Sequence, residues 1–468
     1  MSRSMLIIGA GVAGCMAADE VRKHPELGLR PVGFVDDDAA LCGSERAGLP
    51  VLGDRGDIDR IAAKHQVEVL LLAIPSAPGS VIRDLVEVCA RVRAEFRVVP
   101  GIREIISGDV RWTQIRELRP EDLLGRESVE LDPAGAVRHF EGRTVLVTGA
   151  GGSIGSELCR WAARSGAARV VLLGHSENEL YELDDELRAA FPRVAVSMAM
   201  ADVRDRIRLE RAVADCGPSV VYHAAAHKHV PLMEGHPEEA VKTNVLGTRH
   251  VLAAARAAGV ERLVMLSTDK AVRPQSVMGA SKRLAEMILQ DFAARHPGSG
   301  LRVAMTRFGN VVGSRGSVVP LFQRQIARGG PVTVSHRDAT RYFMTIREAA
   351  LLVVLAGAQA RGGELFVLEM GEPISMLELA ERMIAMAGRS GAVPIQFMGL
   401  RPGEKLNEEL GAEGFGRTDV PGVYLATEPL PEAVTLEATI AELSRAAERG
   451  DGAAIRRGIA ALVPDFTA

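Results

Sequence analysis

Several residues with side chains suited to proton transfer follow one apolar run of the sequence. Thr268, Asp269 and Lys270 stand directly after residues 262–266, and Lys282 lies further along. Polar residues at the carboxyl end of a sheet strand sit where α/β folds bind ligands, so we expect this loop to face a ligand. Asp269 and Lys270 would then offer an acid and a base from adjacent positions. Taken alone, the same residues would describe a loop with a helix cap and a surface charge pair.

Two glycine-rich segments match the dinucleotide-binding fingerprint. The first is Gly9–Gly14 after the apolar run Met5–Ile8, and the second is Gly149–Gly155 after Thr144–Val147. Each follows a predicted strand and opens a predicted helix, which is the context that the motif requires. Glycines there permit a tight turn and let backbone N–H groups approach a pyrophosphate. We therefore expect a duplicated fold, with the catalytic residues on the second copy only.

Alternating strand and helix patterns predict a parallel sheet in each copy. In the first, we expect further strands at 31–36, 67–75 and 96–100 and a helix at 81–92. Asp36 closes the second strand, where it can hold a ribose hydroxyl. Because a lone fingerprint is a weak signal, a domain that binds nothing, or only a regulatory nucleotide, is an equal alternative.

The alternation of predicted strands and helices is interrupted between residues 122 and 141. We therefore predict an N-terminal Rossmann-like accessory domain at 1–122, a linker at 123–140 and a larger domain at 141–468. Strands of the larger domain are expected at 144–147, 170–173, 195–198, 220–223, 262–266 and 302–305. Its substrate-binding elements are expected mainly from residue 311 onward, as a smaller lobe on the carboxyl edge of the sheet.

Composition and charge are those of an ordinary soluble protein. Of 468 residues, 47% are apolar and 25% are charged, and the net charge is −4. Lys and Arg are scattered, which does not favour nucleic acid as a partner. No apolar window is long enough for a membrane span, and we expect no signal peptide. The five cysteines include no Cys-x-x-Cys pair, which favours a reducing cytoplasm over a disulfide framework or a zinc site.

The blocks around Asp269 and Lys282 resemble the extended short-chain dehydrogenase/reductases. Within them they are similar to the UDP-N-acetylglucosamine 4,6-dehydratases of bacterial polysaccharide and glycan biosynthesis. Further blocks carry this resemblance from Arg143 to about Leu410, at residues 223–234, 244–248, 307–317, 340–345 and 400–405. The first domain resembles the family's N-terminal nucleotide-binding-like domain, including a tail at 119–126. Many members carry transmembrane helices ahead of that domain, and this sequence shows none.

The resemblance implies an α/β fold with two Rossmann-like, doubly wound parallel-sheet domains, and an NAD-dependent dehydration. Oxidation at the sugar C4 acidifies the C5 hydrogen, a base removes it while an acid protonates the departing 6-hydroxyl, and hydride returns to C6. Thr268 would bind the 4-hydroxyl, Asp269 would be the acid and Lys270 the base. Lys270 can act as a base only if burial near another cation, such as Lys282, lowers its pKa.

One residue departs from the superfamily pattern of Tyr-x-x-x-Lys, whose two members share a helix face. This chain has Met278 ahead of Lys282. Methionine is a known variant in the dehydratase family, and it resembles members that retain configuration at C5. Because methionine cannot move a proton, Asp269, Lys270 or a water relayed to Lys282 are the candidates for deprotonating the 4-hydroxyl.

The resemblance also implies ligand contacts. Those expected with NAD are Gly149, Gly151, Gly152, Ser153, Ile154, Gly155, Glu177, Asp202, Val203, Ala224, Ala225, Ala226, Asn244 and Lys282. Those expected with UDP-N-acetylglucosamine are Lys228, Asn310, Ser317, Arg341 and Glu404. Gly174 stands where NAD-specific relatives usually carry Asp, but Glu177 would repel a 2′-phosphate, so NAD is favoured over NADP. The alternative for Arg341 is a structural salt bridge. Consecutive residues point in different directions, so His227 and His229 do not indicate a metal site.

Two rival functions stay open at this point. A UDP-sugar epimerase would share the cofactor and the sugar, but it generally needs the tyrosine and has no use for an acid–base pair at C5 and C6. A protein that only senses NAD(P) or a nucleotide would have no reason to keep Asp269, Lys270 and Lys282 together. The resemblance also suggests a homo-oligomer.

Overall fold

The computed structural model divides the chain into two compact units. It describes residues 2–74, 134–411 and 415–466, together with residues 81, 85, 88, 91–92, 94–99 and 116–117. The first unit comprises Met1–Glu127, Val318–Arg337 and Ile374–Met398. The second comprises Ser128–Ser317, Asp338–Pro373 and Gly399–Ala468. Two segments from within the predicted domain 141–468 therefore belong to the first unit.

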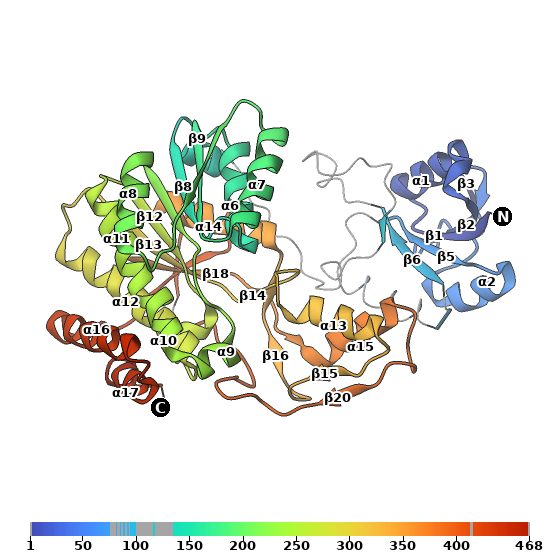
Figure 1. Cartoon of the computed structure of the whole chain (residues 1–468). Helices are drawn as coiled ribbons and strands as arrows, with labels where there is room; N and C mark the ends of the chain where they lie inside the picture. Colours follow the sequence, from blue (N-terminus) through green and yellow to red (C-terminus); the bar gives the residue numbers. More distant parts are fainter. Residues whose placement is uncertain are drawn as a thin grey trace. The chain divides into compact units, whose positions relative to one another are not determined.

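The second unit is built on a nine-stranded sheet, with the order β10-β9-β8-β11-β12-β13-β18-β22-β21 (Figure 1). Its strands are β8 (Thr144–Thr148), β9 (Arg169–Gly174), β10 (Ala195–Met200), β11 (Val220–His223), β12 (Arg262–Leu266), β13 (Arg302–Arg307), β18 (Glu364–Leu368), β21 (Gly416–Arg417) and β22 (Val423–Ala426). The strands from β10 to β18 in this order run parallel, whereas β22 and β21 pair antiparallel at one edge. The chain reverses its direction of winding between β8 and β11, which is the switch point where doubly wound sheets bind ligands.

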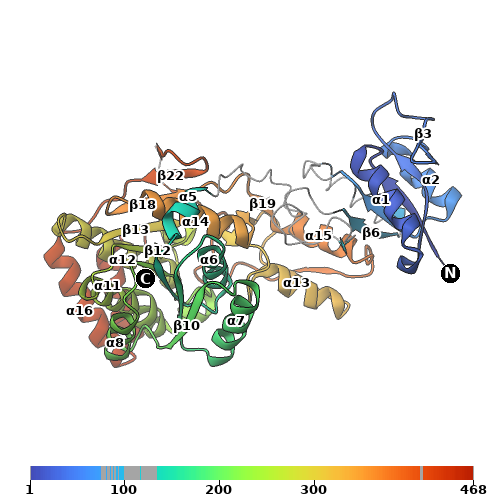
Figure 2. The same cartoon turned by 90° about the horizontal axis from the view of Figure 1, so that it is seen from above.

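Helices cover both faces of this sheet, as the two views in Figures 1 and 2 show. One core contains residues of α8 (Arg206–Cys216), α9 (Val230–Gly235), α10 (Pro237–Ala240), α11 (Gly247–Ala257), α12 (Val277–Arg295), α16 (Ala433–Glu448) and α17 (Gly452–Leu462). The other contains residues of α5 (Ala134–Phe140), α6 (Ser153–Arg164), α7 (Glu177–Ala190) and α14 (Ile346–Gln359). Successive strand residues face opposite sides, so Leu146 lies in the first core while Val145 and Val147 lie in the second.

The prediction of a linker at 123–140 is wrong for its last part, because α5 occupies Ala134–Phe140. Ala136 and Phe140 are one helical turn apart and are both fully buried in the second core. Gly135 lies against α14, where an added Cβ would be 2.8 Å from the Leu355 side chain. The absence of a side chain at Gly135 therefore allows close packing of α5 against α14. Residues 123–133 lie outside the described part of the chain.

The N-terminal part of the first unit is a separate sheet with the order β2-β1-β5-β6-β7. Its elements are β1 (Arg3–Ile8), α1 (Val12–Lys23), β2 (Leu29–Val35), α2 (Ile58–His65), β5 (Val69–Leu72), β6 (Glu95–Val98) and β7 (Arg116–Glu117). The two carboxylate oxygens of Asp36 accept the backbone N–H groups of Ala10 at 2.7 Å and Asp38 at 3.0 Å, and its contact with a ribose stays a prediction. The predicted helix at 81–92 lies mostly, and the tail at 119–126 wholly, outside the described residues. The other segments of this unit carry α13 (Val318–Ala327), β15 (Val332–Val334), α15 (Met376–Met386) and β20 (Ile395–Phe397).

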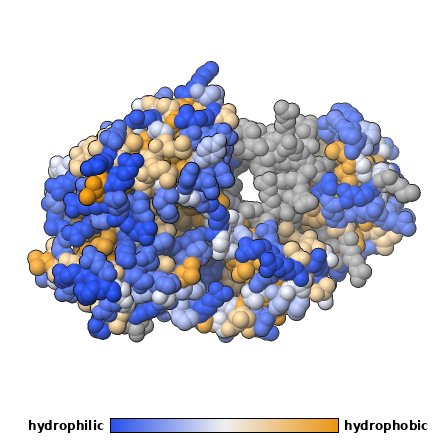
Figure 3. Space-filling view, viewed as in Figure 1, coloured by the Kyte–Doolittle hydropathy of each residue, from blue (hydrophilic) through white to orange (hydrophobic). Residues whose placement is uncertain are grey.

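Apolar side chains are interspersed among hydrophilic ones on the face drawn in Figure 3. Among the residues that the structure describes, no helix combines the length and the apolar character that crossing a membrane requires.

Candidate active site

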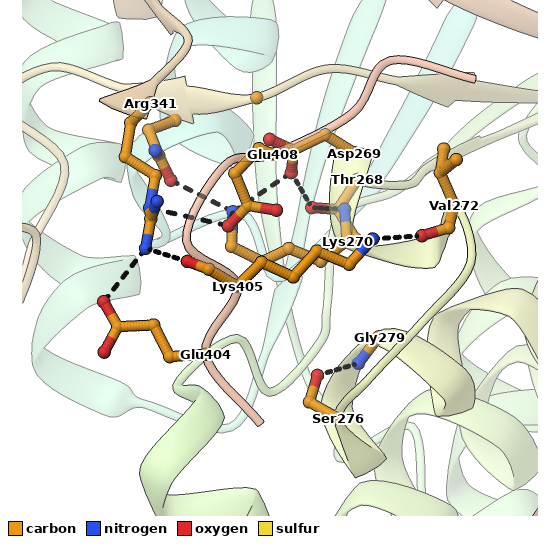
Figure 4. A network of polar contacts seen from close by, with 12 residues as sticks. Thr268, Asp269, Lys270, Val272, Ser276, Gly279, Arg341, Glu404, Lys405 and Glu408 are labelled. Atoms are coloured by element: carbon orange, nitrogen blue, oxygen red, sulfur yellow. Dashed lines mark hydrogen bonds and ion pairs between the residues drawn. The ribbon is translucent and has the colours of Figure 1, made fainter. Parts of the chain in front are cut away.

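The loop after β12 holds Thr268, Asp269 and Lys270 at the carboxyl edge of the sheet (Figure 4). Thr268 ends the extended chain: its hydroxyl accepts from the backbone N–H of Lys270 at 3.3 Å and donates to Asp269 Oδ1 at 2.8 Å. The backbone N–H of Asp269 donates to Phe308 O, beyond the end of the neighbouring strand β13, at 3.0 Å. Asp269 is only 1% exposed, so its carboxylate is almost completely enclosed by the protein.

Lys270 is surrounded by oxygen atoms. Its ammonium donates to Asp269 Oδ1 at 3.1 Å and to Asn310 Oδ1 at 3.3 Å, and Glu408 Oε1 lies 3.3 Å away. Burial favours the neutral amine, but the carboxylates of Asp269 and Glu408 outweigh it and raise the pKa of Lys270 above its ordinary value. The expectation that a neighbouring cation lowers this pKa is therefore wrong for the structure at rest, because the neighbours are anions.

Lys282, unlike Lys270, has a lowered pKa. Its side chain is buried in α12 and makes no hydrogen bond with the described residues. Burial lowers its pKa to about 8, against an opposing effect of Glu286. Met278, one turn earlier, is 2% exposed and packs in the hydrophobic core, so it offers no proton to the site. Lys282 is consequently the amine closest to neutrality near this loop.

A buried ion network supports the loop from behind. Glu286 of α12 is fully buried and accepts from Ser267 Oγ at 2.6 Å, from Arg307 at 2.7 and 2.8 Å, and from Arg283 at 3.2 Å. Arg307 also donates to Glu428 at 2.6 Å. Because Ser267 directly precedes Thr268, this network ties the catalytic loop to β13 and α12 at once.

The second glycine-rich loop forms a cradle against the sheet. Gly149 has a positive φ of 64°, and a Cβ there would lie 2.8 Å from the Ala225 backbone. A Cβ on Gly155 would lie 2.2 Å from Gly149 O, so α6 can approach the loop only because this residue is glycine. Arg315 lies over the loop, donating through its side chain to Gly151 O and through its backbone to Ser153 Oγ at 3.2 Å. The open backbone and the N-terminus of α6 fit a dinucleotide pyrophosphate.

The cradle continues into a buried polar chain on β8 and β11. His223 is fully buried between the Thr148 hydroxyl at 2.7 Å and the Thr248 hydroxyl at 3.1 Å, and burial together with Lys282 lowers its pKa to about 3. Asn244, predicted to contact the cofactor, instead uses its amide within the protein: it bonds the His227 backbone at 2.8 and 3.0 Å and Ser281 Oγ at 2.9 Å. The contact of Asn244 with the cofactor stays a prediction.

The other predicted cofactor residues lie along the same sheet edge. Asp202 follows β10. Burial raises the pKa of its carboxyl, but the ion pair with Arg204 outweighs this effect, so the pKa is lowered. Val203 is buried and closes against Gly247, at which a Cβ would lie 2.9 Å from the valine side chain. Glu177 is exposed at the start of α7. Of the remaining residues, Gly152 and Ile154 belong to the glycine-rich segment, and Ala224 and Ala226 follow β11.

Two predicted substrate residues, Arg341 and Glu404, are bound to each other in the structure. Arg341 is buried and donates to Glu404 Oε1 at 2.9 Å. Its other N–H groups donate to the backbone oxygens of Thr340, Lys405 and Leu406 at 2.7 to 2.8 Å. Figure 4 therefore shows the salt bridge that was the alternative for Arg341, while its contact with the substrate stays a prediction.

The other predicted substrate residues retain polar atoms for a ligand. Asn310 holds Lys270, as described above. Lys228 lies 3.5 Å from Ser314 Oγ, and burial together with Arg315 lowers its pKa. The Ser317 hydroxyl is buried and makes no hydrogen bond with the described residues.

The comparison with known proteins assigns the family. Residues 145–428 match the family model described as polysaccharide biosynthesis protein. The chain belongs to the polysaccharide biosynthesis protein family. Residues 2–100 match the model of a CoA-binding domain. One relative matches most of this chain: the probable polysaccharide biosynthesis protein EpsC of Bacillus subtilis (strain 168). The two are 45% identical over 411 residues, which are 87% of this chain and 68% of EpsC.

This member of the polysaccharide biosynthesis family is also similar to solved structures, one of which is an enzyme. Pen from Bacillus thuringiensis is 33% identical with a TM-score of 0.58, over 62% of this chain and 91% of Pen. DesIV, a dTDP-glucose 4,6-dehydratase from Streptomyces venezuelae solved with NAD bound, is 25% identical with a TM-score of 0.51, over 57% of this chain and 88% of DesIV. These similarities confirm the predicted fold class, an extended short-chain dehydrogenase/reductase built on a doubly wound sheet.

Two residues of the site were not predicted from the sequence. Arg315 stands inside the block 307–317 that carried the family resemblance, but only the fold brings it over Gly151. Glu408 lies just beyond the block 400–405, and its contact with Lys270 spans two distant segments of the chain. The only sequence signal for Glu408 was its place after that block.

Proposed function

We propose that this protein is an NAD-dependent 4,6-dehydratase of UDP-N-acetylglucosamine, retaining the configuration at C5, that serves polysaccharide or glycan biosynthesis. The observation that carries the proposal is the pair Asp269 and Lys270, joined at 3.1 Å in a buried loop at the ligand-binding edge of the sheet. The family match, and the likeness to a nucleotide-sugar dehydratase, support the reaction class. Met278 in place of the tyrosine favours dehydration over epimerisation and resembles retaining members.

The pair can supply acid and base together by exchanging one proton. Lys270 is the protonated partner at rest, because its pKa is raised. Transfer of one proton from Lys270 Nζ to Asp269 Oδ1, across their hydrogen bond, leaves a neutral amine and a carboxylic acid. The amine then takes the C5 proton as Asp269 protonates the 6-hydroxyl, which departs as water. Both side chains then have their starting charges, so the elimination needs no external proton. Once hydride has returned to C6, C5 takes a proton from the Lys270 ammonium. The proton that Lys282 took from the 4-hydroxyl then restores the charge of Lys270, and the cycle is closed.

The first oxidation needs a group that removes the proton of the 4-hydroxyl. Lys282, with its pKa near 8, is partly neutral at neutral pH, and Met278 cannot serve. We assign this proton to Lys282, directly or through water, while Thr268 holds the hydroxyl oxygen. The positive charge that Lys282 gains is close to the nicotinamide ribose that the family resemblance places beside it.

The glycine cradle fits NAD as the cofactor. When bound, NAD accepts a hydride from the sugar C4 and returns it to C6. The backbone of Gly149–Gly155, the N-terminus of α6 and Arg315 would hold the pyrophosphate. Glu177, at the start of α7, disfavours a 2′-phosphate and hence NADP.

Incubation of the purified protein with UDP-N-acetylglucosamine and NAD in D₂O tests the reaction. We expect a product that has lost one water and carries deuterium at C5, detected by mass spectrometry and proton NMR, with C5 coupling constants that report retention. A UDP-sugar of unchanged mass and inverted C4 would establish an epimerase instead. Absence of any product, with NAD bound, would favour the sensing function.

Replacing Gly155 with Ala is expected to weaken NAD binding. The new methyl group would meet Gly149 O at 2.2 Å and push the loop out of the position that cradles the pyrophosphate. A displacement that costs about 1.4 kcal/mol of binding free energy raises the Kd about tenfold, and we expect at least that much in a calorimetric titration. Gly298→Ala, where no atom lies within 4 Å of the added Cβ, is the matched control. Equal affinities in the two variants would contradict the placement of NAD at this loop.

A further inference from the structure

Charged side chains from three separate segments of the second unit meet at Lys270. Asp269 belongs to the loop after β12, Arg341 to β16 (Thr340–Arg341), and Glu408 to the segment that follows residue 399 (Figure 4). Glu408 Oε1 lies 3.3 Å from Lys270 Nζ and 3.5 Å from Arg341 Nε. This one carboxylate therefore joins the lysine of the acid–base pair to the buried arginine of a different strand.

The Glu408 carboxylate is buried and incompletely hydrogen-bonded, which is unfavourable for a charged group. Its side chain is 3% exposed, and Oε2 has no hydrogen-bond partner among the described residues. The same is true of Asp269 Oδ2. A buried carboxylate stays ionised only beside a compensating cation, and here Lys270 and Arg341 are the cations in contact with Glu408. Structural stability alone does not explain two buried, incompletely bonded carboxylates around one lysine.

We propose that Glu408 is a positioning residue of the active site, which holds the Lys270 ammonium against Asp269 and keeps it charged until the proton passes to Asp269. An ammonium has three N–H donors, and three oxygens lie within reach of this one, on Asp269, Asn310 and Glu408. Among the described residues, removing the Glu408 charge would leave Asp269 as the one anion in contact with the ammonium. The inference rests on the proposed function, because it assigns a role within that acid–base pair.

The charged groups that face Lys270 are Asp269 on its own loop, Glu408, and Arg341 on β16, and their effects can be separated. Burial and Arg341 lower the pKa of Lys270, whereas Asp269 and Glu408 raise it. An opposite charge at this range shifts a pKa by about one unit or more. Neutralising Glu408 is therefore expected to lower the pKa of Lys270 by about that amount.

The experiment measures the titration of Lys270 itself in Glu408→Gln. Competitive labelling with acetic anhydride over a series of pH values, read on the Lys270 peptide by mass spectrometry, gives its pKa without substrate. We expect a fall of about one unit or more relative to the wild type. Glu409→Gln is the matched control, because this adjacent carboxylate pairs with Arg273 instead, and it is expected to leave the Lys270 titration unchanged.

An unchanged Lys270 pKa in Glu408→Gln would overturn the proposal, since a purely structural Glu408 would alter the melting temperature but not this titration. Glu408→Asp withdraws the carboxylate by one methylene and is expected to give a value between those of the wild type and Glu408→Gln. If the glutamine variant does not fold, a wild-type value in Glu408→Asp overturns the proposal. Because labelling needs no turnover, a wild type that fails to dehydrate the sugar would refute the proposed function separately.

Discussion

Asp269→Asn is expected to reduce dehydration by about two to four orders of magnitude while leaving NAD affinity unchanged. Asparagine nearly preserves the shape of the side chain and can still accept from Thr268 and Lys270, so the loop should keep its geometry. It cannot take the lysine proton or deliver it to the 6-hydroxyl, and general acid catalysis typically contributes factors of that size. Turnover of UDP-N-acetylglucosamine and an NAD titration measure the two quantities.

The matched control for this variant is Asp419→Asn, at an exposed position away from the site. It is expected to turn over substrate like the wild type. If Asp269→Asn retained more than about a tenth of wild-type turnover, Asp269 would not be the acid, because loss of a positioned acid costs far more.

Arg307→Met is expected to destabilise the second unit by about 3–5 kcal/mol. Glu286 is fully buried and takes both of its shortest ionic bonds, at 2.7 and 2.8 Å, from Arg307. Breaking a buried pair by removing one partner leaves an uncompensated charge, which accounts for an effect of that size. Urea unfolding monitored by circular dichroism measures the change. Because Glu286 also holds Ser267, we expect turnover to fall as well.

Arg295→Met is the control, on the helix α12 that also carries Glu286. Arg295 pairs with Asp291 and Glu437 but is 45% exposed, and surface ion pairs contribute about 0–1 kcal/mol. Equal losses of stability in Arg295→Met and Arg307→Met would show that the buried network contributes no more than a surface pair.

The sequence was sufficient to predict the strands of the second sheet. Alternation of apolar runs with helical patterns predicted β8, β11 and β12 within about a residue of their ends, because a buried parallel strand is apolar throughout. The place of Thr268, Asp269 and Lys270 at the carboxyl edge followed from the same rule. The late antiparallel strands β21 and β22 were not predicted, since they are short and their pairing depends on the edge that β18 presents.

Charges were harder to predict than positions. The proton affinity of Lys270 depends on Glu408, which approaches it from a segment far along the chain. Likewise, Arg341 has the right chemistry for a diphosphate, but three backbone oxygens and Glu404 use its donors in this structure. No spacing in one sequence indicates such long-range partners. Local periodicity predicted the scaffold, whereas the electrostatics of the site required the fold.

The most direct test of the central claim uses UDP-N-acetylglucosamine carrying deuterium at C4 of the sugar. In a 4,6-dehydratase the hydrogen removed from C4 is returned to C6 of the same molecule, so we predict a 4-keto-6-deoxy product with deuterium in its C6 methyl group. Proton NMR and mass spectrometry locate the label. Recovery of the label at C4 of a sugar that has kept its 6-hydroxyl and inverted its C4 would contradict dehydration and establish an epimerase in its place.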